Sequence, residues 1–172
     1  MRRTWRRSWP LYTLGVVFLI AMGANLLVGY LIREEPNYSQ IEEGLYVGGA
    51  LKQPPPGTKA VLNLCETADS YEVPLQKWEP IQDASPAPSI DWLREQVNFI
   101  DHQRKAGKVT FVHCRNGISR SGMVVVAYEM VKNGMMRDEA LALVRAKRPE
   151  VRPNSAFQDL LLEWEKEVKG NR

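Results

Sequence analysis

In the stretch Val109–Met130, VTFVHCRNGISRSGMVVVAYEM, an apolar strand, a short polar loop and an apolar helix follow one another. Val109–His113 is an apolar run of strand length, and Met123–Tyr128 is apolar on all sides, which is typical of a buried central helix. A loop between such a strand and helix directs its backbone N–H groups to one point, at the positive end of the helix dipole. The stretch therefore predicts an anion-binding loop.

The polar residues of this loop indicate phosphate chemistry. Gly117 permits the tight backbone path, and Arg120 is a planar fork that can bind two phosphate oxygens. The same positive field stabilises a thiolate at Cys114, which makes the sulfur a nucleophile at neutral pH. A thiolate below a bound phosphate is placed for in-line attack on phosphorus.

The segment His113–Ser121 resembles the H-C-x2-G-x2-R-S signature of the cysteine-dependent protein phosphatases and is most similar to their dual-specificity branch. The similarity extends over residues 41–165 and includes Val61–Leu64, which resembles the "VLN" strand of the family. The resemblance implies an α/β fold with a central, mostly parallel sheet flanked by helices. It also implies hydrolysis through a phosphocysteine on Cys114, with no cofactor and no metal ion.

The resemblance also assigns roles within the loop. Cys114 is the nucleophile, and Arg120 holds the phosphoryl oxygens. Ser121 assists the loss of the thiolate from the phosphoenzyme, although a hydroxyl at a helix start can also be purely structural. Arg115 is either an added charge at the mouth of the site or a solvated surface residue. The residues expected to bind phosphate are Cys114, Arg115, Asn116, Gly117, Ile118, Ser119 and Arg120.

Two further residues are expected to support the loop, and a third, Cys65, is a possible redox partner. His113 holds the loop and tunes Cys114 through hydrogen bonds rather than acting as a base. Asn154 resembles the family asparagine that braces the phosphate loop, but a simple N-cap role fits equally well. Cys65 is either a small buried hydrophobe or, as in lipid-directed relatives, a redox partner that forms a reversible disulfide with Cys114.

A general acid must protonate the leaving oxygen. Asp83 lies 31 residues before Cys114, and its position matches the acid loop of the family. Asp91 is better suited to the N-terminus of a helix. We therefore expect Asp83 to be the acid, out of the carboxyl candidates Asp69, Glu72, Glu79, Asp83 and Asp91.

The rest of the chain alternates between strand and helix patterns, which is typical of an α/β domain with a mostly parallel sheet. Residues 66–89 are polar and contain several prolines, so an irregular stretch is expected there. Strands are predicted at residues 44–49, 60–65 and 109–113, and helices at 89–106, from the loop to Gly134, at 137–148 and at 153–168.

The N-terminal segment has the pattern of a membrane anchor. Residues 1–7 form a basic flank with four arginines, and residues 8–32 carry no charged side chain, which is enough for the roughly 20 apolar residues of a membrane span. We predict an uncleaved transmembrane helix at 8–32, then a juxtamembrane linker (33–44) and a catalytic domain (45–172). A cleaved signal peptide is the main alternative; a buried core helix and a mitochondrial presequence are the others.

The distribution of charge along the chain predicts how the protein is oriented in the membrane, and it argues against nucleic-acid binding. The arginines before the span place the N-terminus in the cytoplasm and the domain across the membrane, as a single-pass protein. The remaining residues hold 19 of the 23 basic side chains against all 20 acidic ones, so there is no basic footprint for nucleic acid. Two cysteines are too few for a disulfide scaffold or an all-cysteine zinc site, and the two histidines, His102 and His113, do not suggest a metal site.

The sequence thus predicts a membrane-anchored phosphatase that hydrolyses phosphotyrosine, phosphoserine and phosphothreonine in proteins. Its partners are a phosphoprotein substrate and the bilayer, which it contacts through residues 8–32. Hydrolysis of a phospholipid or phosphoinositide at the same site is the alternative, because an anchor holds the site near lipid head groups. A non-catalytic phosphate-binding module would need to lack Cys114, Arg120 or the acid, and all are present; a membrane adaptor that uses the domain only as an interaction surface is a further class.

Overall fold

The computed structural model describes Ile20, Met22 and residues 36–170. The chain divides into two units, Met1–Glu35 and Pro36–Arg172. The predicted basic flank and membrane helix, residues 1–7 and 8–32, lie outside the described residues except for Ile20 and Met22. Within the described part of the chain, no helix is both long enough and apolar enough to cross a membrane.

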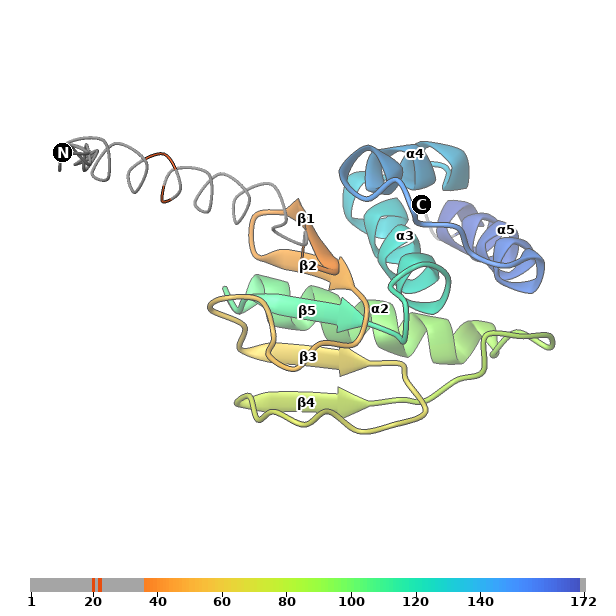
Figure 1. The fold of residues 1–172 in the computed structure, drawn as a ribbon. Coiled ribbons are helices and arrows are strands. Elements are labelled where there is room, and N and C mark those ends of the chain that lie inside the picture. The colour runs from red at the N-terminus through yellow and green to blue at the C-terminus, as the bar shows by residue number, and fades with distance from the viewer. Residues whose placement is uncertain (1–19, 21, 23–35, 171–172) are drawn as a thin grey trace, which may run out of the picture. The chain divides into compact units, whose positions relative to one another are not determined.

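The unit Pro36–Arg172 is built on a mixed sheet with the strand order β1-β2-β5-β3-β4 (Figure 1). Neighbouring strands from β2 to β4 run parallel, and only β1 pairs antiparallel with its neighbour β2. The prediction of an α/β fold with a mostly parallel sheet is confirmed. The strands of the described residues are β1 (Tyr38–Glu42), β2 (Leu45–Gly48), β3 (Ala60–Asn63), β4 (Leu75–Trp78) and β5 (Thr110–His113).

Two strands lie where none was predicted. β1 occupies part of the segment 33–44 that the sequence suggested to be a linker, and β4 lies within the stretch 66–89 that was expected to be irregular. Both are edge strands that contribute little to the core. Ile41 is the only buried residue of β1, and the residues of β4 alternate between half-buried and exposed. Neither strand therefore carries the apolar run that marks a buried strand in the sequence.

The helices begin and end close to the predicted residues. The Oγ of Ser89 accepts a hydrogen bond from the backbone N–H of Trp92 at 3.2 Å and so caps α2. Gly134, with a φ of 66°, ends α3 in the left-handed conformation that favours glycine. The helices of the unit Pro36–Arg172 are α2 (Ile90–Lys105), α3 (Arg120–Asn133), α4 (Arg137–Lys147) and α5 (Ser155–Gly170).

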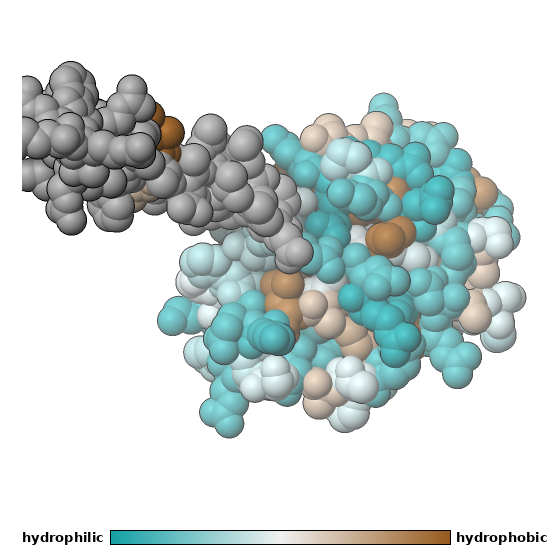
Figure 2. All heavy atoms as spheres, viewed as in Figure 1, coloured by the Kyte–Doolittle hydropathy of each residue, from teal (hydrophilic) through white to brown (hydrophobic). Residues whose placement is uncertain are grey.

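Helix α3 is the central helix of the unit, as its uniformly apolar sequence predicted. It packs against α2, α4 and α5 and against the strands β2 and β5. Every residue from Arg120 to Met130 is buried. The opposite face of the sheet carries a smaller apolar cluster around Val61, Tyr71 and Phe111. Hydrophilic residues cover most of the visible face of the unit in Figure 2.

The sheet topology brings distant loops to one edge. In the pairing of β3 with β5, Asn63 lies opposite His113, so both strands end at the same level. The loop after β3 and the loop after β5 therefore leave the sheet side by side (Figure 1). The carboxyl ends of parallel strands are where α/β folds place their ligand sites.

Candidate active site

The loop between β5 and α3 follows a path that only glycine permits at one position. Gly117 has a φ of 71°, and a Cβ at this position would lie 2.3 Å from the carbonyl carbon of Gly48 and 2.5 Å from the backbone nitrogen of Gly49. Both neighbours are backbone atoms, which cannot move away independently. The predicted need for glycine at this turn is therefore explained by close backbone packing as well as by conformation.

Residues outside the loop donate hydrogen bonds to its backbone carbonyl groups. The backbone N–H of Ala50 donates to the carbonyl of Arg115 at 3.1 Å, and the N–H of Arg152 donates to the carbonyl of Ile118 at 2.9 Å. The buried guanidinium of Arg148 donates to the carbonyls of Gly117 at 2.9 Å and Asn116 at 3.3 Å. A peptide N–H points away from its own C=O, so these contacts direct the loop amides inward, as an anion-binding loop requires.

Cys114 lies at the base of the loop and is 1% exposed. Its Sγ is 3.3 Å from the Oγ of Ser121, in the first turn of α3. Burial is the largest single influence on the pKa of Cys114 and would raise it. The hydrogen bonds from the hydroxyl and N–H of Ser121 and from the N–H of Gly117, together with the charge of Arg120, outweigh burial and lower the pKa below its ordinary value.

The guanidinium of Arg120 is held by hydrogen bonds at Nη1, whereas its Nε makes none within the described part of the chain. Its Nη1 donates to Glu66 Oε1 at 2.8 Å and to the carbonyls of Ile81 at 3.0 Å and Leu64 at 3.3 Å. Its Nε is buried and has no acceptor among the described residues. A buried, unpaired donor beside the loop is the group expected to receive a phosphate oxygen.

Asp83 lies at the mouth of the loop. Its Oδ1 accepts hydrogen bonds from Ser119 Oγ at 2.6 Å and from Asn154 Nδ2 at 2.8 Å. Its Oδ2 is 3.9 Å from Arg120 Nε. Asn154 also caps α5, because its Oδ1 accepts from the N–H of Phe157 at 3.0 Å. The helix-cap role of Asn154 is therefore seen in its side chain, whereas its link to the phosphate loop is made by its backbone N–H, which donates to Ser119 Oγ at 3.1 Å.

The other carboxyl candidates lie away from this mouth. Asp91 is in the first turn of α2 and pairs with Arg94. Glu79 lies 3.7 Å from Lys77, and Glu72 is exposed. Asp69 contacts His113 rather than the open side of the loop, with 3.1 Å between Oδ1 and Nε2.

His113 and Cys65 lie behind the loop. His113 is fully buried, and its Nδ1 is 3.6 Å from the Sγ of Cys65. Both cysteines are free thiols in the structure. Burial is the main reason why the pKa of Cys65 is raised, to about 12, with the neighbouring Cys114 as the next cause. The disulfide between Cys65 and Cys114 stays a prediction.

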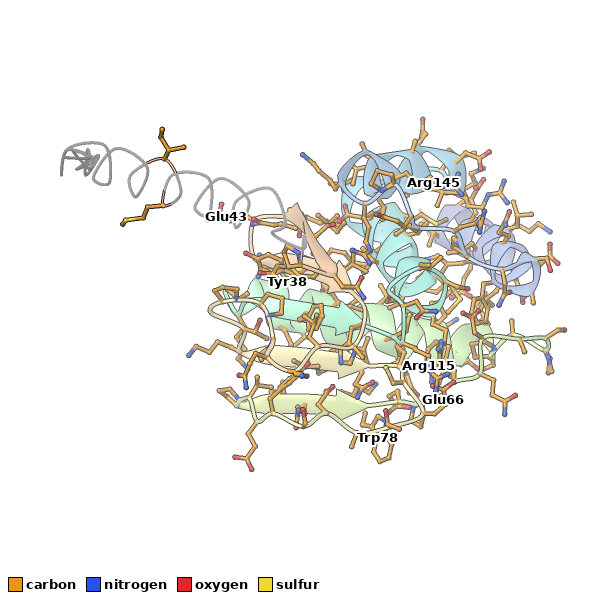
Figure 3. All side chains as sticks on the ribbon, viewed as in Figure 1. Tyr38, Glu43, Glu66, Trp78, Arg115 and Arg145 are labelled. Atoms are coloured by element: carbon orange, nitrogen blue, oxygen red, sulfur yellow. The ribbon has the colours of Figure 1, made fainter. Side chains whose placement is uncertain are left out.

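Sequence reasoning missed two residues that shape the site. Glu66 holds Arg120 from the loop after β3, and Arg148 holds the phosphate loop from the end of α4. Figure 3 shows Glu66 and Arg115 at the same edge of the sheet, with Trp78 beyond them at the end of β4. A charged residue such as Arg148 carried no signal of this role, because it lies 31 residues from its partner Gly117.

Gly117→Ala should weaken both phosphate binding and turnover by at least about tenfold. The added Cβ meets backbone on two sides, so the loop must open and its amides must turn. Phosphate release and binding of inorganic phosphate measure the effect. Gly107→Ala is the matched control: Gly107 has a φ of 68° and no atom within 4 Å of its Cβ position, so its alanine should cost only about 1–2 kcal/mol of stability. Equal losses of activity in both variants contradict the prediction.

At pH 7, iodoacetamide should alkylate Cys114 much faster than Cys65. The thiolate is the reactive form, and the pKa of Cys114 is lowered whereas that of Cys65 is raised to about 12. Mass spectrometry of the labelled peptides measures the ratio, and prior addition of inorganic phosphate should slow the reaction at Cys114. Preferential labelling of Cys65 contradicts the assignment of the nucleophile.

Together these features define a class of protein: an α/β domain with a buried cysteine of lowered pKa at the base of a loop that directs its amides inward. A family model described as "Dual specificity phosphatase, catalytic domain" matches residues 54–167. The chain belongs to this family, and the predicted resemblance to dual-specificity phosphatases is confirmed. Human dual specificity protein phosphatase 1 is 39% identical over 89 residues, which is 52% of this chain and 24% of that protein. The chain spans about a quarter of the length of the curated relatives it matches first.

Solved structures share the fold of this chain. Human DUSP28 superimposes with a TM-score of 0.71 at 22% identity, and the match covers 79% of this chain and 97% of that one. PTPMT1, determined in complex with PI(5)P, gives a TM-score of 0.71 at 18% identity, covering 78% of this chain and 98% of that one. At these identities the likeness establishes the fold alone.

Proposed function

We propose that the protein is a phosphatase that hydrolyses phosphomonoesters in phosphoproteins through a phosphocysteine on Cys114. The observation that carries the proposal is the pairing of two groups. The sulfur of Cys114 receives hydrogen bonds that lower its pKa, and the buried Nε of Arg120, which makes no hydrogen bond with the described residues, lies at the end of the same loop. One group is a nucleophile, and the other is a donor for the oxygens of the group under attack.

In the first step, Cys114 attacks phosphorus, so a sulfur–phosphorus bond forms while the bond to the leaving oxygen breaks. The leaving oxygen takes a proton from Asp83. The Oδ1 of Asp83 already accepts two hydrogen bonds, from Ser119 and Asn154, so Oδ2 is the oxygen that carries this proton. The loop amides and Arg120 hold the other phosphoryl oxygens throughout.

In the second step, water attacks the phosphocysteine and Asp83 takes a proton from it. The sulfur–phosphorus bond breaks, and Cys114 leaves as a thiolate. A thiolate can only accept hydrogen bonds, so the hydroxyl of Ser121, 3.3 Å away, is the donor at this stage. This contact supports the role that the family resemblance implied for Ser121.

Phosphate release from a panel of substrates tests the function. The panel holds peptides with phosphotyrosine, phosphoserine and phosphothreonine and vesicles that carry phosphoinositides. Release from the peptides by the wild-type chain, with trapping of a phosphoenzyme by rapid acid quench, supports the proposal. A chain that binds inorganic phosphate but releases none from any substrate is a non-catalytic binding module, and this result overturns the proposal.

Hydrolysis of phosphoinositides is the second candidate. PTPMT1, a structural neighbour, was determined with PI(5)P. Arg115 is an exposed residue of the loop and adds positive charge where an anionic lipid head group would approach. Faster release from the phosphoinositide vesicles than from every peptide favours this candidate over the phosphoprotein one.

Membrane anchoring through residues 8–32, with the N-terminus in the cytoplasm, completes the proposal. Its support is the uncharged segment and the four arginines before it. Protein that stays with membranes after an alkaline carbonate wash supports the anchor, and release by the wash contradicts it. Protease added to the cytoplasmic face of sealed vesicles should leave the domain intact until detergent opens them; digestion before detergent contradicts the orientation.

A further inference from the structure

Asp69 takes part in no step of the proposed phosphatase mechanism. It lies in the loop after β3, and its side chain is only 7% exposed. Asn63 shapes this loop at the end of β3, because its side chain donates to the carbonyl of Thr67 at 3.0 Å and accepts from the N–H of Cys65 at 2.7 Å. A buried carboxylate needs polar partners; Tyr71 lies near Asp69, and the ring of His113, the residue directly before the nucleophile, lies 3.1 Å from its Oδ1.

Both ring nitrogens of His113 are engaged. Nε2 lies 3.1 Å from Oδ1 and 3.3 Å from Oδ2 of Asp69, and Nδ1 lies 3.6 Å from the sulfur of Cys65. The ring also stacks on Phe111, with 4.9 Å between the ring centroids and 16° between the planes. The imidazole is therefore fixed in its plane by packing and at both ends by polar contacts.

The partners determine where the ring proton resides. An ionised carboxylate can only accept a hydrogen bond, so the proton shared with Asp69 belongs to Nε2 of His113. Cys65 stays a thiol because burial raises its pKa, to about 12, and a thiol can donate its proton to Nδ1. With Cys65 as the donor at Nδ1 and Asp69 as the acceptor at Nε2, the Nε2–H tautomer satisfies both polar contacts of the ring.

The fixed imidazole is joined directly to the phosphate loop. The carbonyl of His113 accepts from the N–H of Leu64 at 2.9 Å, and the N–H of Cys114 donates to the carbonyl of Gly48 at 3.3 Å. His113 is thus held by its ring contacts and by a backbone bond, and Cys114 is the next residue, so loss of the ring contacts would loosen the chain directly before the nucleophile. The sulfur has to stay within reach of the amides and the hydroxyl that stabilise its thiolate.

We propose that Asp69 is a positioning residue of the phosphatase reaction, which holds His113 in the Nε2–H tautomer and thereby fixes Cys114 against its hydrogen-bond donors. The role rests on the proposed function, since it acts on the same nucleophile. Cys65 takes part as the donor to the second ring nitrogen.

Nitrogen-15 NMR of the full-length protein tests the tautomer directly. The chain has two histidines, and a His102→Gln background leaves only the signals of His113. In the wild-type protein, the nitrogen-15 chemical shifts of His113 should be those of a neutral imidazole with its proton on Nε2. Asp69→Ala should lose that preference, whereas Asp69→Asn should keep it, because the amide oxygen can still accept the proton. An imidazolium or an Nδ1–H tautomer in the wild type overturns the proposal, even if the alanine variant fails to fold.

Alkylation of Cys114 by iodoacetamide gives the second readout, which needs no substrate and so is independent of whether phosphatase activity is found. Asp69→Ala should slow alkylation about tenfold, the effect of weakening a hydrogen bond to a charged group. Asp69→Asn should restore most of the rate. Glu72→Ala is the matched control, because it removes a carboxylate from the same loop at an exposed position. A slower rate in Asp69→Ala with an unchanged tautomer overturns the proposal, as does an unchanged rate.

Discussion

Cys114→Ser should lower phosphate release from phosphopeptides by about 10⁴-fold or more, the scale of loss seen when a catalytic nucleophile is removed. A serine hydroxyl at this position has the loop amides and Arg120 around it but stays protonated at neutral pH. The hydrogen bonds that stabilise a thiolate are not enough to ionise an alcohol, because an alkoxide binds its proton far more tightly than a thiolate does. Initial rates on one phosphotyrosine peptide measure the loss.

The same variant should still bind inorganic phosphate. The carbonyls of the loop remain bound by Ala50, Arg148 and Arg152, so the amides keep their inward direction. Retained binding, measured by calorimetry, shows that the loop has folded and that the lost rate belongs to the sulfur. Turnover within tenfold of the wild type contradicts the nucleophilic role of Cys114.

The parts of the site that are local in sequence could be predicted from it. The strand β5, the phosphate loop and α3 are contiguous, so the apolar runs and Gly117 mark them without knowledge of the fold. Ser89 and Gly134 mark helix ends for the same reason, since a cap is a contact over a few residues.

The parts that depend on topology could not be predicted. Glu66 reaches Arg120 across 54 residues, and Asp69 reaches His113 across 44, because β3 lies beside β5 in the sheet. Asp69 was considered only as a candidate acid, since a carboxylate in the sequence gives no sign of which side of a loop it will face. The edge strands β1 and β4 were missed because their polar, half-exposed residues resemble those of a loop.

Asp83→Asn should reduce kcat by about 10²–10⁴-fold on a phosphoserine peptide, the usual contribution of general acid catalysis. The substitution removes the acid but keeps its surroundings. An asparagine oxygen can accept the hydrogen bonds that Ser119 and Asn154 now donate to Oδ1, at 2.6 and 2.8 Å. The contacts between the acid loop and the phosphate loop should therefore survive, and the loss should report the missing proton.

The leaving group separates this chemical role from a structural one. A serine alkoxide is a poor leaving group and needs the proton of Asp83, whereas a nitrophenolate leaves readily without it. The loss in Asp83→Asn should therefore be much smaller on p-nitrophenyl phosphate. Asp91→Asn is the control, because Asp91 pairs with Arg94 on the surface of α2 and should leave both rates unchanged. Equal losses on the two substrates would show that Asp83 only braces Ser119 and Asn154, and the acid would then have to be another group.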